Sequence, residues 1–150
     1  MSILCENKRA FHDYTLLEKY VAGLALTGQE VKAIKNHQIS LKGSFVTFSN
    51  NEAFLTNAHV SAYKNAGELP SYEPERSRKL LLKKKEISNL VEKKQTQGLT
   101  VVPIKIFISR RGLLKIEIAL ARGKKQFDKR ADIAKRESQR RMQRISSSLN

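Results

Sequence analysis

Side chains that catalyse reactions or hold metals are few in this sequence and poorly spaced for that work. Its three histidines, His12, His37 and His59, lack a second histidine at the spacing of a helical zinc site, and Cys5 is the single cysteine. Asp13 follows His12, but on a strand neighbouring side chains point to opposite faces, so the two could not act together there. A phosphate-binding glycine loop ending in lysine is also missing from the sequence. These residues predict no catalytic site, no metal site and no cofactor.

Basic side chains are the stronger chemical signal. The 150 residues include 29 lysines and arginines but only 14 acidic residues, so the formal net charge is +15. Such a charge indicates a polyanionic partner, either nucleic acid or an anionic membrane surface. No apolar run approaches the roughly 20 residues of a membrane-spanning helix. Binding to a membrane surface is the weaker alternative, because the apolar residues spaced along the C-terminal part are mostly small and tryptophan is absent.

One group of cations lies near the N-terminus beside aromatic residues. Lys8 and Arg9 are followed by Phe11, His12 and Tyr14. Folded RNA suits this combination, because rings can stack on unpaired bases while cations bind phosphates. Packing of the aromatic residues into the core explains the same residue types equally well.

Two further basic groups follow later in the chain. No acidic residue interrupts the stretch from Arg76 to Lys85, and on a helix its cations at 76, 79 and 83 would form one row. Such runs are usually solvated helix faces, although the unbroken charge favours phosphate contact here. The third group comprises Arg122, Gly123, Lys124 and Lys125.

Antiparallel strands are the elements that should position these groups. The clearest strand is 113–121, where Leu114, Ile116 and Ile118 share one face and Lys115 lies on the other. Pro103 predicts an edge or a bulge in the preceding strand. Other strands are expected at 14–20, 44–48, 52–60 and 99–108, with helices at 28–36 and 75–95 and a loop at 61–75. The pattern predicts a mainly β protein with flanking helices, built as a small closed antiparallel barrel of the oligonucleotide-binding type.

Two local signals mark the ends of elements. Thr27 and Glu30 have the spacing of a helix-capping box, which favours a structural role for Glu30 over that of a general base. Asn36 is expected to end this helix in the left-handed conformation. Asn50 and Asn51 should form a hairpin turn that requires positive φ angles.

The C-terminal part of the chain differs from the rest in charge. Residues 121–150 hold ten basic and three acidic side chains. Apolar or small residues recur there every three or four positions from Phe127 to Leu149, which predicts a helix. A short helix of like charges is marginal in water, so we expect it to form only on an anionic surface. The chain is therefore divided into a folded domain, residues 1–121, and a basic tail, residues 122–150, that is disordered when free.

Several sequence blocks resemble one known family. The segment from Asn7 to Tyr14, NKRAFHDY, resembles the opening of the small protein B family, the SsrA-binding proteins. The resemblance continues in order through residues 22–32, 52–55, 57–59, 78–82, 98–103 and 121–130. Blocks of this length and order are too specific for chance.

The resemblance implies a bacterial cytoplasmic RNA-binding protein that is not an enzyme. Such proteins bind the transfer-RNA-like domain of transfer-messenger RNA and deliver it to stalled ribosomes for trans-translation. Their tail enters the messenger channel of the small subunit near the decoding centre as a helix. No membrane or small-molecule substrate is implied. Composition and a barrel alone would also allow a generic ribosomal or other structural RNA-binding protein.

Matching positions imply which residues contact RNA. Together with Lys8 and Arg9 from the N-terminal group, the expected RNA-binding residues are Asn7, His12, Leu81, Lys83, Lys115, Arg122, Lys124 and Lys125. Those expected to meet the ribosome are Phe127, Asp128, Lys129, Arg130, Lys135 and Arg136. Val21 stands where the family commonly has glutamate, so that contact is absent or replaced.

Overall fold

The structure is a computed structural model that describes residues 2–63, 72–124 and 136–142. Its strands are β1 (Ser2–Glu6), β2 (Tyr14–Leu24), β3 (Ile39–Ser40), β4 (Phe45–Ser49), β5 (Glu52–Thr56), β6 (His59–Val60), β7 (Arg78–Leu81), β8 (Thr100–Ile108) and β9 (Leu114–Gly123). Its helices are α1 (Lys8–Asp13), α2 (Gly28–Lys35) and α3 (Lys84–Gln97), and residues 136–142 are also helical. None of the described helices is long and apolar enough to cross a membrane.

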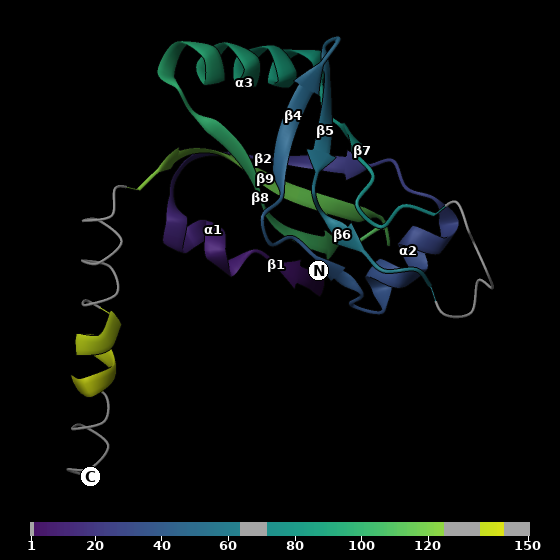
Figure 1. The fold of residues 1–150 in the computed structure, drawn as a ribbon, viewed down its shortest axis with the longest axis horizontal. Helices are drawn as coiled ribbons and strands as arrows, with labels where there is room; N and C mark the ends of the chain where they lie inside the picture. The colour runs from purple at the N-terminus through teal and green to yellow at the C-terminus, as the bar shows by residue number, and fades with distance from the viewer. Residues whose placement is uncertain (1, 64–71, 125–135, 143–150) are drawn as a thin grey trace.

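One antiparallel sheet forms the body of the molecule (Figure 1). Its seven strands follow the order β1-β8-β9-β2-β7-β5-β4, and β3 pairs with β6 in a separate two-stranded sheet. The inner face buries a core to which α2 contributes Ala33 and Ile34 and α3 contributes Ile87 and Leu90. On the other face, Ala10 of α1 packs with Val102 and Ala121. The prediction of a mainly β fold with flanking helices is confirmed.

The expected closed barrel is not formed by the strand ladder. The sheet has two ends, β1 and β4. β4 lies against β8, where closure would occur. β8 pairs with β9 along its length and with β1 at Lys105–Ile108, and no ladder joins it to β4. The N-terminal strand β1, which the sequence pattern did not indicate, takes the β8 edge opposite β9 at Lys105–Ile108, so that β1 and β4 are the two ends of the sheet.

Most local signals in the sequence have the expected effect. The capping box is present: the Thr27 side chain accepts a hydrogen bond from the Glu30 N–H, and the Glu30 carboxylate accepts one from the Thr27 N–H. Asn50 and Asn51 form the β4–β5 turn with φ angles of 52° and 61°. A register shift after Pro103 confirms a bulge in β8. The helix end differs, because His37 and not Asn36 takes the positive φ, 61°.

Two elements differ from the prediction. The helix expected at 75–95 begins only at Lys84, and residues 78–81 form β7. There Arg78 and Leu80 point inward while Lys79 and Leu81 are exposed, so the period is that of a strand. The alternation was not recognised in the sequence, because Arg78 is charged and a charged residue is expected to be exposed. The second difference is α1, which contains His12 and Asp13 and was not predicted as a helix.

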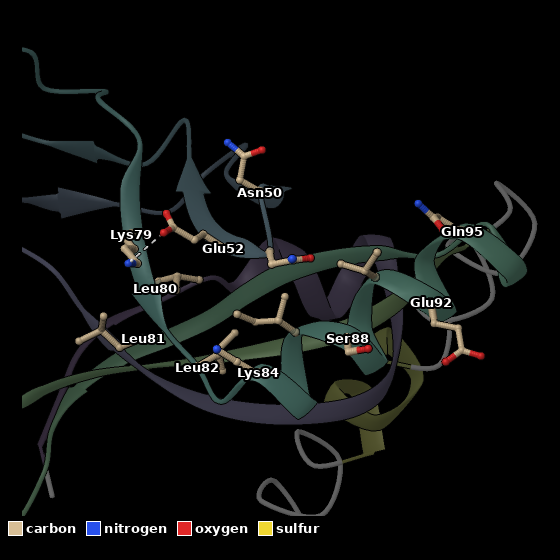
Figure 2. Close-up of a pocket in the computed structure, with 13 residues that line it drawn as sticks. Asn50, Glu52, Lys79, Leu80, Leu81, Leu82, Lys84, Ser88, Glu92 and Gln95 are labelled. Atoms are coloured by element: carbon tan, nitrogen blue, oxygen red, sulfur yellow. Dashed lines mark hydrogen bonds and ion pairs between the residues drawn. The ribbon is translucent and has the colours of Figure 1, made fainter.

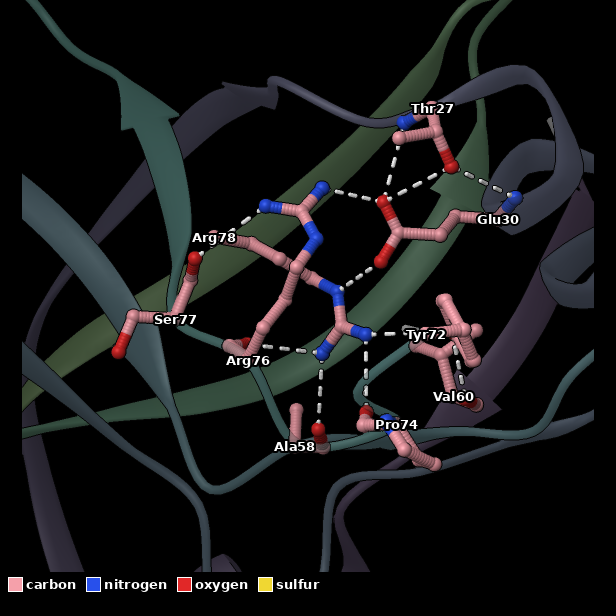
Figure 3. A network of polar contacts seen from close by, with 9 residues as sticks. All are labelled: Thr27, Glu30, Ala58, Val60, Tyr72, Pro74, Arg76, Ser77 and Arg78. Carbon is pink, nitrogen blue, oxygen red and sulfur yellow. Dashed lines mark hydrogen bonds and ion pairs between the residues drawn. The ribbon is translucent and has the colours of Figure 1, made fainter. Parts of the chain in front are cut away.

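Glu30 and Arg78 form a buried ion pair that joins distant segments (Figure 3). Arg78 Nε donates to Glu30 Oε2 at 2.6 Å, and neither side chain is more than 1% exposed. Arg78 also donates to the carbonyl oxygens of Ala58 and Pro74, both at 2.9 Å, and Arg76 donates to Glu30. We call this group the Glu30–Arg78 clamp. It holds the start of α2, the segment after β5 and the entry to β7 in one place.

The clamp also sets the ionisation of Glu30. Burial opposes the charged form, but hydrogen bonds from Arg76, Thr27 and Arg78 outweigh it and hold the pKa of Glu30 below its usual range. Because the pKa is lowered in the folded state, the stabilising contribution is present at neutral pH. It is lost as the pH falls through the folded pKa.

We predict that Glu30→Ala lowers the free energy of unfolding by about 3–5 kcal/mol, because it leaves the buried Arg78 without its counter-ion. Urea unfolding of the full chain measures this change. Glu52→Ala is the matched control, since Glu52 forms an exposed pair with Lys79 at 3.4 Å and its loss should change stability by about 1 kcal/mol or less. The variant at Glu30 should also lose less stability than the wild type on acidification. Equal losses for the two variants would contradict the clamp.

Candidate nucleic-acid interface

The structure separates the expected RNA-binding residues into two groups along β9. Lys115 lies near the start of this strand, whereas Arg122 and Lys124 lie at its end. Seven residues at a rise of about 3.3 Å separate Lys115 from Arg122 by about 23 Å. Any ligand that contacts both groups must therefore be extended or large.

The first group lies on the exposed face of the sheet. Gly23 of β2 is in register with Leu81 of β7 on one side and with Lys115 of β9 on the other. The row continues through Phe107 to Ile3. Leu81 is 55% exposed although it is a large apolar residue. We call the row of Leu81, Gly23 and Lys115 the sheet-face site.

Gly23 leaves room for the Leu81 side chain at the centre of this row. A side-chain carbon added at Gly23 would lie 3.2 Å from Leu81 Cδ1 and 3.3 Å from Leu81 Cβ. Leu81 therefore lies over Gly23. The site presents an apolar side chain beside the Lys115 cation, a combination that can contact a base or a sugar together with a phosphate.

Val21 borders the sheet-face site and is 52% exposed. The residue in register with it on β9 is Glu117. The Glu117 carboxylate lies 3.9 Å from Lys19 Nζ and 4.0 Å from Lys105 Nζ. The exposed position is thus apolar at Val21, and a carboxylate flanked by two lysines lies on the neighbouring strand.

The second group combines α1 with the end of β9, and we call it the α1 site. Lys8 and Arg9 are exposed on α1, and Arg122 is exposed at the end of the strand. The Lys124 N–H donates to Asp13 O at 2.9 Å, and Lys124 Nζ lies 3.3 Å from Phe11 O. These bonds fix the end of α1 on the end of β9. They bring cations together that are more than 100 residues apart in the chain.

His12 and Asp13 contact each other within the α1 site. His12 Nδ1 lies 2.8 Å from Asp13 Oδ1, and Arg9 Nε lies 3.8 Å from Asp13 Oδ2. The separation that a strand would impose on them does not apply, because both residues are helical.

Asn7 is placed inside the fold. Its side chain donates from Nδ2 to Pro103 O at 2.9 Å, its N–H donates to Ile104 O at 2.7 Å, and the residue is only 8% exposed. In this structure Asn7 positions α1 beside the bulge of β8. Its side chain forms a hydrogen bond within the protein and does not belong to the exposed surface.

The expected row of cations at 76, 79 and 83 does not exist. Arg76 contacts Glu30, and Lys79 pairs with Glu52 at the rim of a groove (Figure 2). The groove has a volume of about 880 Å³ and lies between β7, the β4–β5 turn and α3. Lys83 is exposed just before α3, where its N–H donates to Glu86 Oε1 at 3.0 Å. The helical reading failed because residues 78–81 form a strand.

A polar network that the sequence did not indicate holds α3 against β2. Asn89 Nδ2 donates to Tyr20 Oη at 2.6 Å, Tyr20 Oη donates to Glu18 Oε2 at 2.8 Å, and Lys93 contacts Glu18. The hydrogen bond between Lys93 and Glu18 lowers the pKa of the glutamate and raises that of the lysine. Asn89 and Lys93 are four residues apart on one helix face, which is the only local signal for the network.

Most tail residues expected to meet the ribosome lie outside the described residues. These are Phe127, Asp128, Lys129, Arg130 and Lys135, and Lys125 of the RNA-binding set lies outside as well. Arg136 begins the helical segment 136–142, whose side chains are exposed.

Metal or thiol chemistry has little support in the described part of the chain. No three histidine, cysteine, aspartate or glutamate side chains gather there as metal ligands. Cys5 is half-buried, and burial raises the pKa of its thiol.

Comparison with known proteins identifies the family. The family model described as SmpB protein matches residues 4–148. The chain belongs to the SmpB family. The SsrA-binding protein of Thermosipho melanesiensis is 50% identical over 95% of this chain and 96% of its own length. That of Trichodesmium erythraeum is 46% identical, over 95% of this chain and 90% of its own.

A solved structure supports the same relationship for this SmpB-family chain. It is described as "tmRNA-SmpB: a journey to the center of the bacterial ribosome". Its matching chain is 44% identical with a TM-score of 0.67, and the match covers 81% of this chain and 85% of that chain.

For this SmpB-family chain we predict that Gly23→Ala displaces Leu81 while changing stability by about 1 kcal/mol or less. The new methyl group must push Leu81 away, and the loss of a flexible glycine in a strand offsets part of that crowding. Methyl NMR shifts of Leu81 measure the displacement. Gly28→Ala is the control, because nothing lies within 4 Å of a side-chain carbon there. Unchanged Leu81 methyl signals in Gly23→Ala would contradict the close contact.

Proposed function

We propose that this chain binds the transfer-RNA-like domain of transfer-messenger RNA and delivers it to stalled ribosomes for trans-translation. The similarity to SsrA-binding proteins over 95% of the chain carries this proposal. The net charge of +15 supports an RNA partner. The chain then acts in the cytoplasm, as a binding protein without catalysis, and needs neither a cofactor nor a small-molecule substrate.

The separation of the two sites favours a folded RNA over a single RNA strand bound in one groove. The sheet-face site and the α1 site are separated by about 23 Å of strand, and each offers lysine or arginine beside an apolar or aromatic residue. A folded RNA with unstacked loop bases can fill both at once. We further propose that the curved sheet acts as a barrel of the oligonucleotide-binding type, with the packing of β4 on β8 in place of a closing ladder.

The tail, residues 122–150, has a separate role in this proposal. Residues 1–121 fold without it and bind the RNA together with Arg122, Lys124 and Lys125 at the start of the tail. The tail is disordered when free and becomes helical in the messenger channel of the small subunit, near the decoding centre. Its charge supports this, because ten cations in residues 121–150 suit a channel walled by ribosomal RNA. The residues assigned to that contact are Phe127, Asp128, Lys129, Arg130, Lys135 and Arg136.

We predict that truncation after Gln126 leaves the affinity for the transfer-RNA-like domain within about threefold, because both RNA-binding sites are retained. Peptide tagging on stalled ribosomes should be abolished, because the messenger channel stays empty. Calorimetry with the isolated RNA domain and a reconstituted stalled translation reaction measure the two effects.

The full-length chain is the positive control in both assays, and its thermal unfolding provides the reference for the truncated form. Normal tagging by the truncated chain would contradict the role of the tail. If the full-length chain did not bind this RNA but bound ribosomes regardless of stalling, it would be a general ribosomal protein and the proposed function would be wrong.

A further inference from the structure

One specific hydrogen bond holds the His12 ring in the α1 site. His12 Nδ1 lies 2.8 Å from Asp13 Oδ1, and this carboxylate is the only hydrogen-bond partner of the ring among the described residues. An ionised carboxylate can only accept a hydrogen bond, so Nδ1 must carry the proton. The other ring nitrogen, Nε2, is then an acceptor whenever the imidazole is neutral.

Two cations, Arg9 and Lys124, contact the residues on either side of His12 in the chain. Arg9 Nε lies 3.8 Å from Asp13 Oδ2 and gives the carboxylate a cationic neighbour. Lys124 Nζ lies 3.3 Å from the carbonyl oxygen of Phe11, next to His12 in the chain. The His12 side chain itself remains 33% exposed. A ligand with phosphates for the two cations would present its sugar to the ring.

We propose that Asp13 is a positioning residue that presents His12 Nε2 as a hydrogen-bond acceptor to a 2′-hydroxyl group of the bound RNA. Phosphate oxygens cannot donate a hydrogen bond to Nε2, whereas a 2′-hydroxyl can. This contact would let the α1 site distinguish RNA from DNA. The inference rests on the proposed function, because its ligand is the transfer-RNA-like domain.

The tautomer of His12 can be read directly in the free protein. Long-range proton–nitrogen NMR of the full chain at alkaline pH should show His12 protonated at Nδ1. Asp13→Ala should shift the ring towards a mixture of tautomers. His59 is an internal reference, because its Nδ1 lies 3.6 Å from Glu75, too far for a hydrogen bond that would select one tautomer. A wild-type His12 protonated at Nε2 would overturn the proposal, whether or not the variants fold.

Binding of singly 2′-deoxy-substituted RNAs tests the contact itself. One deoxy position should weaken binding to the wild-type chain about fivefold, the loss expected for one hydrogen bond. The same substitution should have no effect on His12→Asn, whose amide can still reach Asp13 but has no acceptor at the Nε2 position. Asp13→Ala should show a reduced effect. Glu75→Gln, the matched control at the other histidine–carboxylate pair, should behave as the wild type.

The possible failures are distinguishable. If every deoxy substitution affects the wild type and His12→Asn equally, the 2′-hydroxyl contact is overturned while the proposed function stands. Failure of the wild-type chain to bind the RNA would overturn both.

Discussion

The buried ion pair between Glu30 and Arg78 is the constraint on which the rest of the structure depends. Two charges can be buried only if each finds its partner and its remaining hydrogen bonds, and here Arg78 also donates to three backbone carbonyl groups. The pair joins residues 48 positions apart. It therefore ties the start of α2 to the entry of β7, so that neither can shift without leaving a buried charge alone.

This constraint decides which side chains the RNA-binding surface displays. Successive residues of a strand point to opposite faces, so an inward Arg78 requires an outward Lys79 and Leu81. A slip of one residue would bury Leu81 and expose Arg78. The same strand thus carries a clamp residue on one face and, on the other, the exposed Leu81 of the proposed RNA-binding surface. The α1 site is fixed separately, through the bonds of Asn7 to β8 and of Lys124 to α1.

Local patterns in the sequence were sufficient to predict some elements of the fold but not others. The last strand was predicted correctly because its apolar residues alternate, and the capping box and the Asn50–Asn51 turn because each is decided by a few adjacent residues. β7 was not predicted, because its inward residue is a charged one whose partner lies on another element. α1 was missed because it is short and buries only Ala10. The pairing of β1 with β8 joins residues about 100 positions apart, so no local sequence pattern indicates it.

The central claim is that two separate surfaces, held in place by the fold, bind one RNA. Backbone amide NMR of the full-length chain, titrated with the transfer-RNA-like domain, tests it most directly. The account predicts the largest shift changes in α1 with the end of β9, and in the row of Leu81, Gly23 and Lys115, while α2 and β6 stay unchanged. Large changes confined to α2 and β6, with both surfaces unaffected, would contradict it.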